Sequence, residues 1–193
     1  QNILTLMGYA SDEKLNFEEM SNIFSSDPGL SYKLLRFINN PFYGRSQEIT
    51  SLKHALIYLG DIELKKFIAL LALTDLNDSK PTEIIRLSLV RAKFCEHVSL
   101  AFLTGILSLI DGVLDNKIET IVEILPIHQE IKQALVNQDN YLSDFLDLAK
   151  AIEVGNWNEN DQLIKRLSLT HDDCLKAHEA ATLWADGMLN VAL

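Results

Sequence analysis

Residues 27–60 read DPGLSYKLLRFINNPFYGRSQEITSLKHALIYLG and predict two helices joined by a bent loop. Asp27 is a favourable N-cap, because its carboxylate can accept hydrogen bonds from the free N–H groups of the first turn. Pro28 fits the first helical position, where no N–H is needed. Apolar side chains then recur every three or four residues, which gives the helix one apolar face. Pro41 ends it, because the residue before a proline avoids helical geometry.

The second helix of this stretch is predicted between Ser51 and Gly60. Ser51 is a suitable N-cap, and Gly60 can end the helix in the left-handed conformation that glycine tolerates. Asp61 can then cap a further helix. Lys65 and Lys66 within that helix could form a local basic patch.

The rest of the chain also has the helical period, and no segment shows the sustained alternation of a half-buried strand. A long helix is predicted from Pro81 to about Phe102, with Gly105 where it meets the next helix. Several shorter helices follow residue 116, including one over 162–169 with Asn160 as its N-cap. The predicted fold class is therefore all-α, an irregular multi-helix bundle.

Composition limits the possible partners and sites. The 193 residues hold 17 Lys or Arg against 27 Asp or Glu, a formal net charge of −10. This charge argues against broad nucleic-acid binding, which needs clustered cations, and against binding to anionic membranes. No signal peptide or membrane-spanning apolar run is present, so the cytoplasm is the expected location. Cys95 and Cys174 have no spacing typical of a disulfide framework or a zinc site.

Two segments within residues 27–60 carry a family resemblance: LLRFINN at residues 34–40 and SLKHALIYLG at residues 51–60. They resemble the core signature of HDOD domains, which are relatives of HD-type phosphohydrolases that have lost their catalytic residues. Asn40 departs from the usual serine. Three later segments resemble the HDOD half of bacterial signalling proteins that pair it with an EAL-type domain, the fold of cyclic di-GMP phosphodiesterases: ILPIHQEIKQAL (124–135), EVGNW (153–157) and ATLWA (181–185).

The resemblance also indicates where metal ligands would stand. Residues 101–109, AFLTGILSL, keep the frame around the His-Asp pair of HD phosphohydrolases, but Ser108 and Leu109 occupy the two ligand positions. Arg91 stands at the position that resembles the first ligand histidine. Because such enzymes need imidazoles and carboxylates on a divalent ion, the resemblance implies no catalytic residue, no metal, no cofactor and no enzymatic activity. His171 and Asp172 form a His-Asp dipeptide that is better explained as the start of a helix.

Three polar residues are candidates for lining a binding cleft: Arg36, Asn39 and Arg91. An arginine presents a fork of donors that suits a phosphate or carboxylate. A structural role, such as an ion pair or a capped carbonyl, is the alternative for each of them.

The resemblance favours a single HDOD domain over residues 1–193, with core helices in 1–115 and a helical extension packed on them in 116–193. An upstream EAL-type domain is expected to lie outside this chain. The preferred hypothesis is a non-catalytic signalling module in cyclic di-GMP-related signalling, which contacts another protein or its own EAL-type domain. One alternative is a sensor that binds a nucleotide or another small ligand, and another is a metal-dependent phosphohydrolase.

Overall fold

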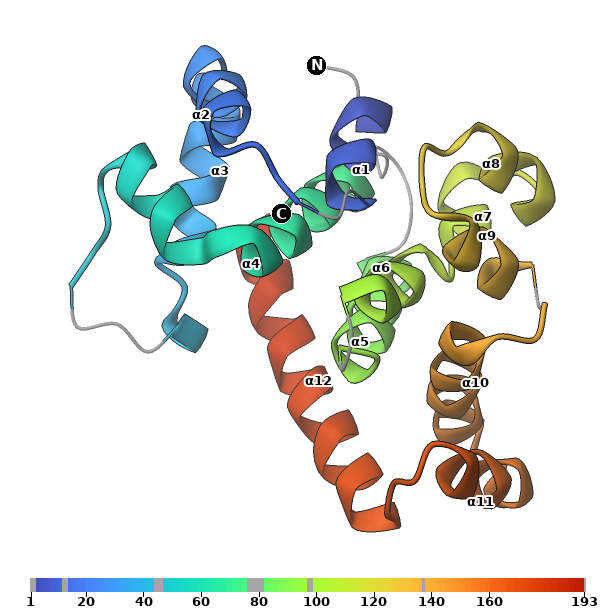
Figure 1. Ribbon diagram of the computed structural model, residues 1–193. Helices are drawn as coiled ribbons and strands as arrows, with labels where there is room; N and C mark the ends of the chain where they lie inside the picture. Colours follow the sequence, from blue (N-terminus) through green and yellow to red (C-terminus); the bar gives the residue numbers. More distant parts are fainter. Residues whose placement is uncertain are drawn as a thin grey trace.

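The computed structural model describes residues 3–11, 14–43, 47–75, 82–96, 99–136 and 138–192. Within these ranges the chain forms α-helices and one short 3₁₀ helix, with no strand (Figure 1), which confirms the predicted all-α fold class. The elements are α1 (Ile3–Ser11), α2 (Phe17–Ser26), α3 (Pro28–Ile38), η1 (Pro41–Tyr43), α4 (Leu52–Asp75), α5 (Thr82–Phe94), α6 (Ser99–Leu107), α7 (Ile110–Leu114), α8 (Ile118–Ile124), α9 (Gln129–Leu135), α10 (Tyr141–Val154), α11 (Trp157–Arg166) and α12 (His171–Ala192).

The start and stop signals of α3 are confirmed. The Asp27 carboxylate accepts hydrogen bonds from the backbone N–H groups of Gly29 at 2.8 Å and Leu30 at 3.1 Å. Pro28 is the first residue of the helix, which ends at Ile38, before the 3₁₀ turn η1. These contacts satisfy the N–H groups of the second and third helical residues, which have no intrahelical partner, and Pro28 in the first position has no N–H.

Gly60 separates two helical segments of α4. Its φ of +64° and ψ of −175° are open to glycine but strongly disfavoured for other residues. No atom lies within 4 Å of the place where a Cβ would sit, so backbone conformation alone requires the glycine. At the start of α4, the N–H of His54 donates to Ser51 Oγ at 3.4 Å, as the predicted cap requires.

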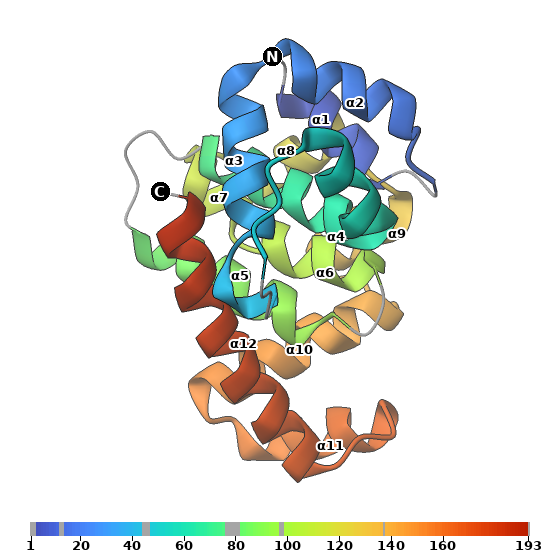
Figure 2. The same cartoon turned by 90° about the vertical axis from the view of Figure 1, so that its left-hand side faces the viewer.

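The second segment of α4 lies in the centre of the molecule, and α5 and α6 pack beside it (Figures 1 and 2). Residues 66–73 are all buried. Phe67 contacts the rings of Phe24 and Phe37, with ring centroids 5.8 Å and 4.9 Å apart. The core therefore joins α4 directly to α2 and α3.

The predicted long helix from Pro81 to Phe102 is wrong, because the chain turns back between α5 and α6; Pro81 itself lies outside the described residues. Gly105 lies inside α6 and not at a junction. A Cβ there would come within 2.6 Å of the Cα and N of Ala92. Gly105 thus allows α6 to cross α5 in close contact, a tertiary requirement that the helical period does not reveal.

The predicted cap at Asn160 is also wrong. α11 begins three residues earlier, at Trp157, and the side chain of Asn156 accepts a hydrogen bond from the N–H of Glu159 at 3.5 Å. Asn160 is buried within the helix. Asn156 and Asn160 are both favourable N-cap residues, and α11 as a whole packs against α10.

α12 runs along α5 and reaches back to the loop after α3 (Figure 2). The Asn40 side chain donates to the carbonyl of Gly187 at 3.3 Å and accepts from the N–H of Phe42 at 2.9 Å. The Phe42 ring fills the space that a side chain on Gly187 would need, at 2.0 Å from its Cβ position. Asn40, which departs from the serine of the HDOD signature, therefore ties the last helix to η1. The division into 1–115 and 116–193 stays a prediction.

Candidate functional site

Arg91 on α5 and Ser108, just after α6, lie together, as the resemblance to a ligand pair implies. Arg91 Nη1 donates to Ser108 Oγ at 3.2 Å. The other side of the guanidinium is occupied by Glu153 of α10: Nε donates to Oε1 at 2.9 Å and Nη2 donates to Oε2 at 2.7 Å. We call these three residues the Arg91 cluster.

In the Arg91 cluster, Arg91 and Glu153 form a largely buried ion pair with two parallel hydrogen bonds. The side chains of Arg91 and Glu153 are only 10% and 14% exposed. A fork of two parallel hydrogen bonds is the strong geometry for an arginine and a carboxylate. Removing one partner of a buried pair leaves an uncompensated charge, so each residue here depends on the other.

The pKa of the neighbouring Cys95 thiol depends on the same burial and charges. Burial raises the pKa of Cys95 to about 12, an effect that the Arg91 charge opposes and the Glu153 charge reinforces. A thiol of this kind is neutral at pH 7 and is a poor nucleophile and metal ligand. Within the part of the chain that the structure describes, no group of three or more His, Cys, Asp or Glu side chains could hold a metal ion.

The other two predicted site residues lie elsewhere. The Asn39 amide forms two hydrogen bonds with the backbone of Ile49, donating to the carbonyl and accepting from the N–H, each at 2.8 Å. Arg36 is exposed on α3, with its guanidinium carbon 5.8 Å from the centroid of the Tyr32 ring. The described contacts of Arg36, Asn39 and Arg91 go to three different parts of the molecule, and their role in binding a ligand stays a prediction.

The sequence analysis missed a second ionic cluster, which we call the Lys66 cluster. Lys66 is buried and does not contribute to a surface basic patch. Its ammonium donates to Glu63 at 2.6 Å and pairs with Glu96, which also pairs with Lys93. The Tyr43 hydroxyl donates to Glu63 at 2.9 Å. The spacing of three residues in Glu63–Lys66 and Lys93–Glu96 is the signal that could have indicated it.

Two aromatic rings support the cations of the Lys66 cluster. Lys66 Nζ lies 5.7 Å from the centroid of Phe102, and Lys93 Nζ lies 5.6 Å from that of Trp184. Burial lowers the pKa of the Lys93 ammonium and the charge of Lys66 lowers it further, whereas Glu63 raises it. Two cations and two carboxylates balance one another, so the cluster links α4, α5, α6 and α12 without a net charge.

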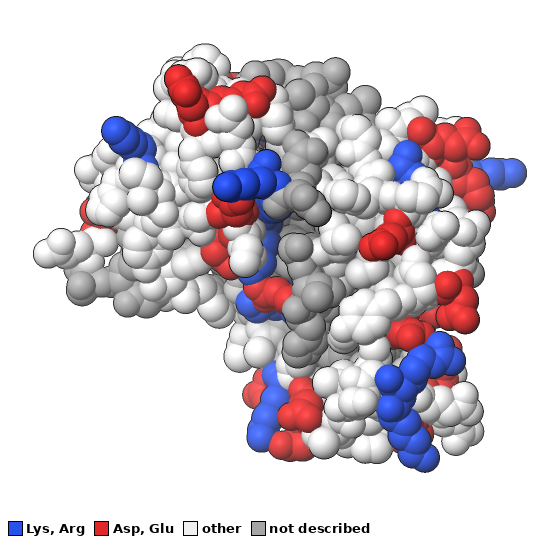
Figure 3. Space-filling model, in the orientation of Figure 1, with Lys and Arg blue, Asp and Glu red and all other residues white. Residues whose placement is uncertain are grey.

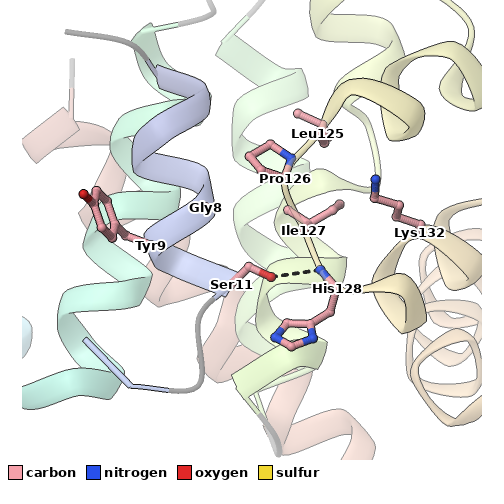
Figure 4. A pocket seen from close by; sticks show the side chains of 8 residues that line it. All are labelled: Gly8, Tyr9, Ser11, Leu125, Pro126, Ile127, His128 and Lys132. Carbon is pink, nitrogen blue, oxygen red and sulfur yellow. Dashed lines mark hydrogen bonds between the residues drawn. The ribbon is translucent and has the colours of Figure 1, made fainter. Parts of the chain in front are cut away.

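A surface groove of about 470 Å³ lies between α1 and the segment that leads into α9 (Figure 4). The N–H of His128 donates to Ser11 Oγ at 2.9 Å across it. The Tyr9 hydroxyl points away from both Lys132 and the His128 ring and donates to Glu19. Because these polar groups do not converge on a common point, the groove does not form a reaction centre.

A family model described as HDOD domain matches residues 1–105, just over half of the chain. The chain belongs to the HDOD family. This confirms the resemblance that residues 34–40 and 51–60 carried. No solved structure matches this HDOD chain.

Two curated relatives extend the match beyond the family model. The chain is 33% identical over 182 residues to "Cyclic di-GMP phosphodiesterase CdgJ" of Vibrio cholerae, which covers 89% of the chain and 42% of that protein. It is 32% identical over 197 residues to "Uncharacterized protein YuxH" of Bacillus subtilis, with 96% and 48% covered. The chain thus spans less than half the length of these relatives.

The comparison with CdgJ overturns one expectation. The sequence analysis expected that this protein is not an enzyme, whereas a relative that matches most of the chain is named a phosphodiesterase. The expectation rested only on the residues at the metal-ligand positions of this chain. CdgJ is more than twice as long as the chain, so those positions say nothing about the rest of CdgJ. The pairing with an EAL-type domain stays a prediction.

No described helix is both long enough and apolar enough to cross a membrane, and the expected cytoplasmic location stays a prediction.

Proposed function

We propose that this HDOD chain is a regulatory module in cyclic di-GMP signalling, and that it acts by direct contact with another protein domain. An EAL-type domain of the same protein is the first candidate for that contact. The observation that carries the proposal is the 33% identity to CdgJ over 89% of the chain, since CdgJ is named a cyclic di-GMP phosphodiesterase.

The two ionic clusters support a module that works through its shape. The Arg91 cluster fills the place where the resemblance would put a metal site, and the Lys66 cluster joins four helices. Both join helices that are distant in the sequence into one scaffold. Such a scaffold can transmit a signal only if its partner prefers one state of the module over another.

The outer surface offers apolar anchors for such a contact. Ile57 on α4, Trp157 at the start of α11 and Leu183 on α12 are 65%, 62% and 59% exposed. Exposed aromatic and aliphatic side chains often dominate binding energy at protein interfaces. The three residues lie on three different helices of the module.

The test replaces each anchor by a charge in the full-length protein: Ile57→Asp, Trp157→Asp and Leu183→Asp. All three positions are exposed, so stability should change by no more than about 0.5 kcal/mol. We expect at least one variant to change the rate of cyclic di-GMP hydrolysis about fivefold or more, because an interface anchor contributes more than about 1 kcal/mol. Asn22→Asp, at an exposed polar position on α2, is the control.

Two results would contradict the proposal. One is a folded protein that neither binds nor hydrolyses cyclic di-GMP. The other is an active protein whose hydrolysis is unchanged by all three substitutions. A thermal shift on addition of nucleotides to residues 1–193 would instead favour a ligand sensor.

A further inference from the structure

A cavity of about 240 Å³ lies between α5, α10 and α12. Its apolar wall is formed by Phe94, Phe145, Leu169, Cys174 and Ala177. Two exposed charged side chains of α12 also line it and mark its mouth, the side that opens to solvent: Asp173 and Lys176. Only Phe94 lies within the residues that the HDOD model matches, so the helices after that match complete the cavity.

The inner wall of this cavity is mainly apolar. Phe94 and Phe145 are each 4% exposed, and Cys174 is 3% exposed. Burial raises the pKa of the Cys174 thiol and the charge of Asp173 raises it further, so the thiol is neutral at pH 7 and acts as a small apolar group. A buried water molecule needs about two to four polar partners, and this wall does not supply them.

Leu169 reaches the cavity from the turn between α11 and α12. Ser168, just before it, has a φ of +56°, which residues other than glycine seldom adopt. The N–H of Leu169 then donates to the carbonyl of Ile164 in α11 at 3.0 Å. This hydrogen bond holds Leu169 against the last turn of α11, so its part of the wall is already in place in the folded chain.

The charged residues at the mouth of the cavity already have partners. Lys176 Nζ pairs with Asp172 at 2.6 Å, and the Asp173 carboxylate accepts from the N–H and Oγ1 of Thr170 at 3.1 Å and 2.6 Å. Figure 3 shows basic and acidic side chains side by side over the lower part of α12. A charged mouth favours a small molecule over a protein partner, because the centre of a protein interface is depleted in charged residues.

We infer that this cavity binds a small neutral aromatic molecule of one or two rings. The rings of Phe94 and Phe145 and the sulfur of Cys174 all make favourable contacts with a further ring. The volume is larger than the ~150 Å³ of an apolar cavity that takes up benzene and smaller than the ~300 Å³ at which sites for drug-sized ligands begin. A bound ring supplies the dispersion contacts that the wall lacks. The inference goes beyond the proposed function and does not depend on it.

The test titrates the 193-residue chain with benzyl alcohol and follows the methyl signals of Leu169 and Ala177 by NMR. We expect both signals to shift to saturation with a Kd below about 1 mM. The methyl signals of Leu125, in the groove beside α1, are the internal control and should not saturate. Benzoate and benzylammonium carry the same ring with a charge, and each should bind about fivefold more weakly or worse, because the wall cannot solvate a charge.

Two variants connect this binding to the cavity. Ala177→Leu fills it, whereas Ala180→Leu makes the same change at an exposed position of α12. We expect the first to weaken benzyl alcohol binding about tenfold or more and the second to change it less than about twofold, because only the first removes the space for the ring. If Ala177→Leu does not fold, Leu169→Ala tests the same wall: the wider cavity should raise the preference for indole over benzyl alcohol about threefold.

Several results would overturn the inference. One is the lack of a saturable shift at Leu169 and Ala177. Another is an equal response at Leu125, which would show that the alcohol binds apolar surface without selection. Tighter binding of benzoate would show that Lys176 selects an anion instead. Binding that stays unchanged in both Ala177→Leu and Leu169→Ala would place the ligand outside this cavity.

Discussion

The Arg91 cluster and the Lys66 cluster bury charge in different ways. Arg91 has one carboxylate partner, Glu153, which is 62 residues away in the sequence and is almost as buried as the arginine. Lys66 has two carboxylate partners, and each is more exposed than the lysine itself. The number and exposure of the partners therefore decide how much one substitution costs, because a buried charge that loses its only partner cannot be solvated by water.

The largest expected effect comes from Glu153→Gln. It leaves the Arg91 guanidinium buried without a counter-charge, so we expect the free energy of unfolding to fall by about 3–5 kcal/mol. Urea denaturation followed by circular dichroism measures it, and Glu179→Gln on the exposed side of α12 is the control. The double variant Arg91→Met with Glu153→Leu should recover most of the loss. A single-variant loss below about 1 kcal/mol would show that water reaches the pair.

Gly105→Ala tests the backbone that forms the Arg91 cluster. The new Cβ would lie 2.6–2.7 Å from backbone atoms of Ala92 and Arg91, so α6 must move away from α5. We expect a loss of about 1–3 kcal/mol in chemical denaturation, the usual cost of overpacking. Gly112→Ala is the matched control, since its nearest neighbour is the flexible end of Ile84 at 3.8 Å. Equal effects of the two substitutions would contradict the close contact.

Glu63→Gln should cost less than Glu153→Gln because Lys66 keeps Glu96. The amide can still accept a hydrogen bond, and Glu63 is about one-third exposed, so solvent screens part of the lost attraction. We expect a loss of about 1 kcal/mol in the same denaturation experiment. A loss as large as that of Glu153→Gln would mean that the second carboxylate of the Lys66 cluster does not compensate.

The sequence predicted what local rules determine. Asp27, Pro28 and Gly60 act through their own backbone or through neighbours within three residues, and all three behave as expected. The contact of Arg91 with Ser108 was implied by a family pattern. Glu153 was not foreseen as the partner of Arg91, because nothing in a sequence ranks one distant carboxylate above another. The break between α5 and α6 was missed for a related reason, since the apolar period continues where the chain turns back.

The smallest expected effect is a change in the pH dependence of stability, which tests whether side chains of the two clusters are shielded from water. Cys95, beside Arg91, has its folded-state pKa raised to about 12 from 9.0, mainly by burial. The raised pKa therefore adds stability to the folded state below pH 9. This contribution is lost as the pH rises from 9 toward 12, because the thiol ionises in the unfolded state over this range but stays neutral in the folded state. At pH 9.5 the loss relative to pH 7 is about 0.8 kcal/mol.

The measurement compares the wild type with Cys95→Ala in urea at pH 7 and pH 9.5. The wild type should lose about 0.8 kcal/mol more than the variant over this range. The lowered pKa of Lys93 acts in the opposite direction, since its ammonium is disfavoured in the folded state and the penalty falls as the pH rises toward 10.5. The wild type should therefore gain stability from Lys93 as the pH rises, and Lys93→Met should remove that gain. If both variants shift the pH dependence in the same direction, burial does not disfavour the charged form of both side chains.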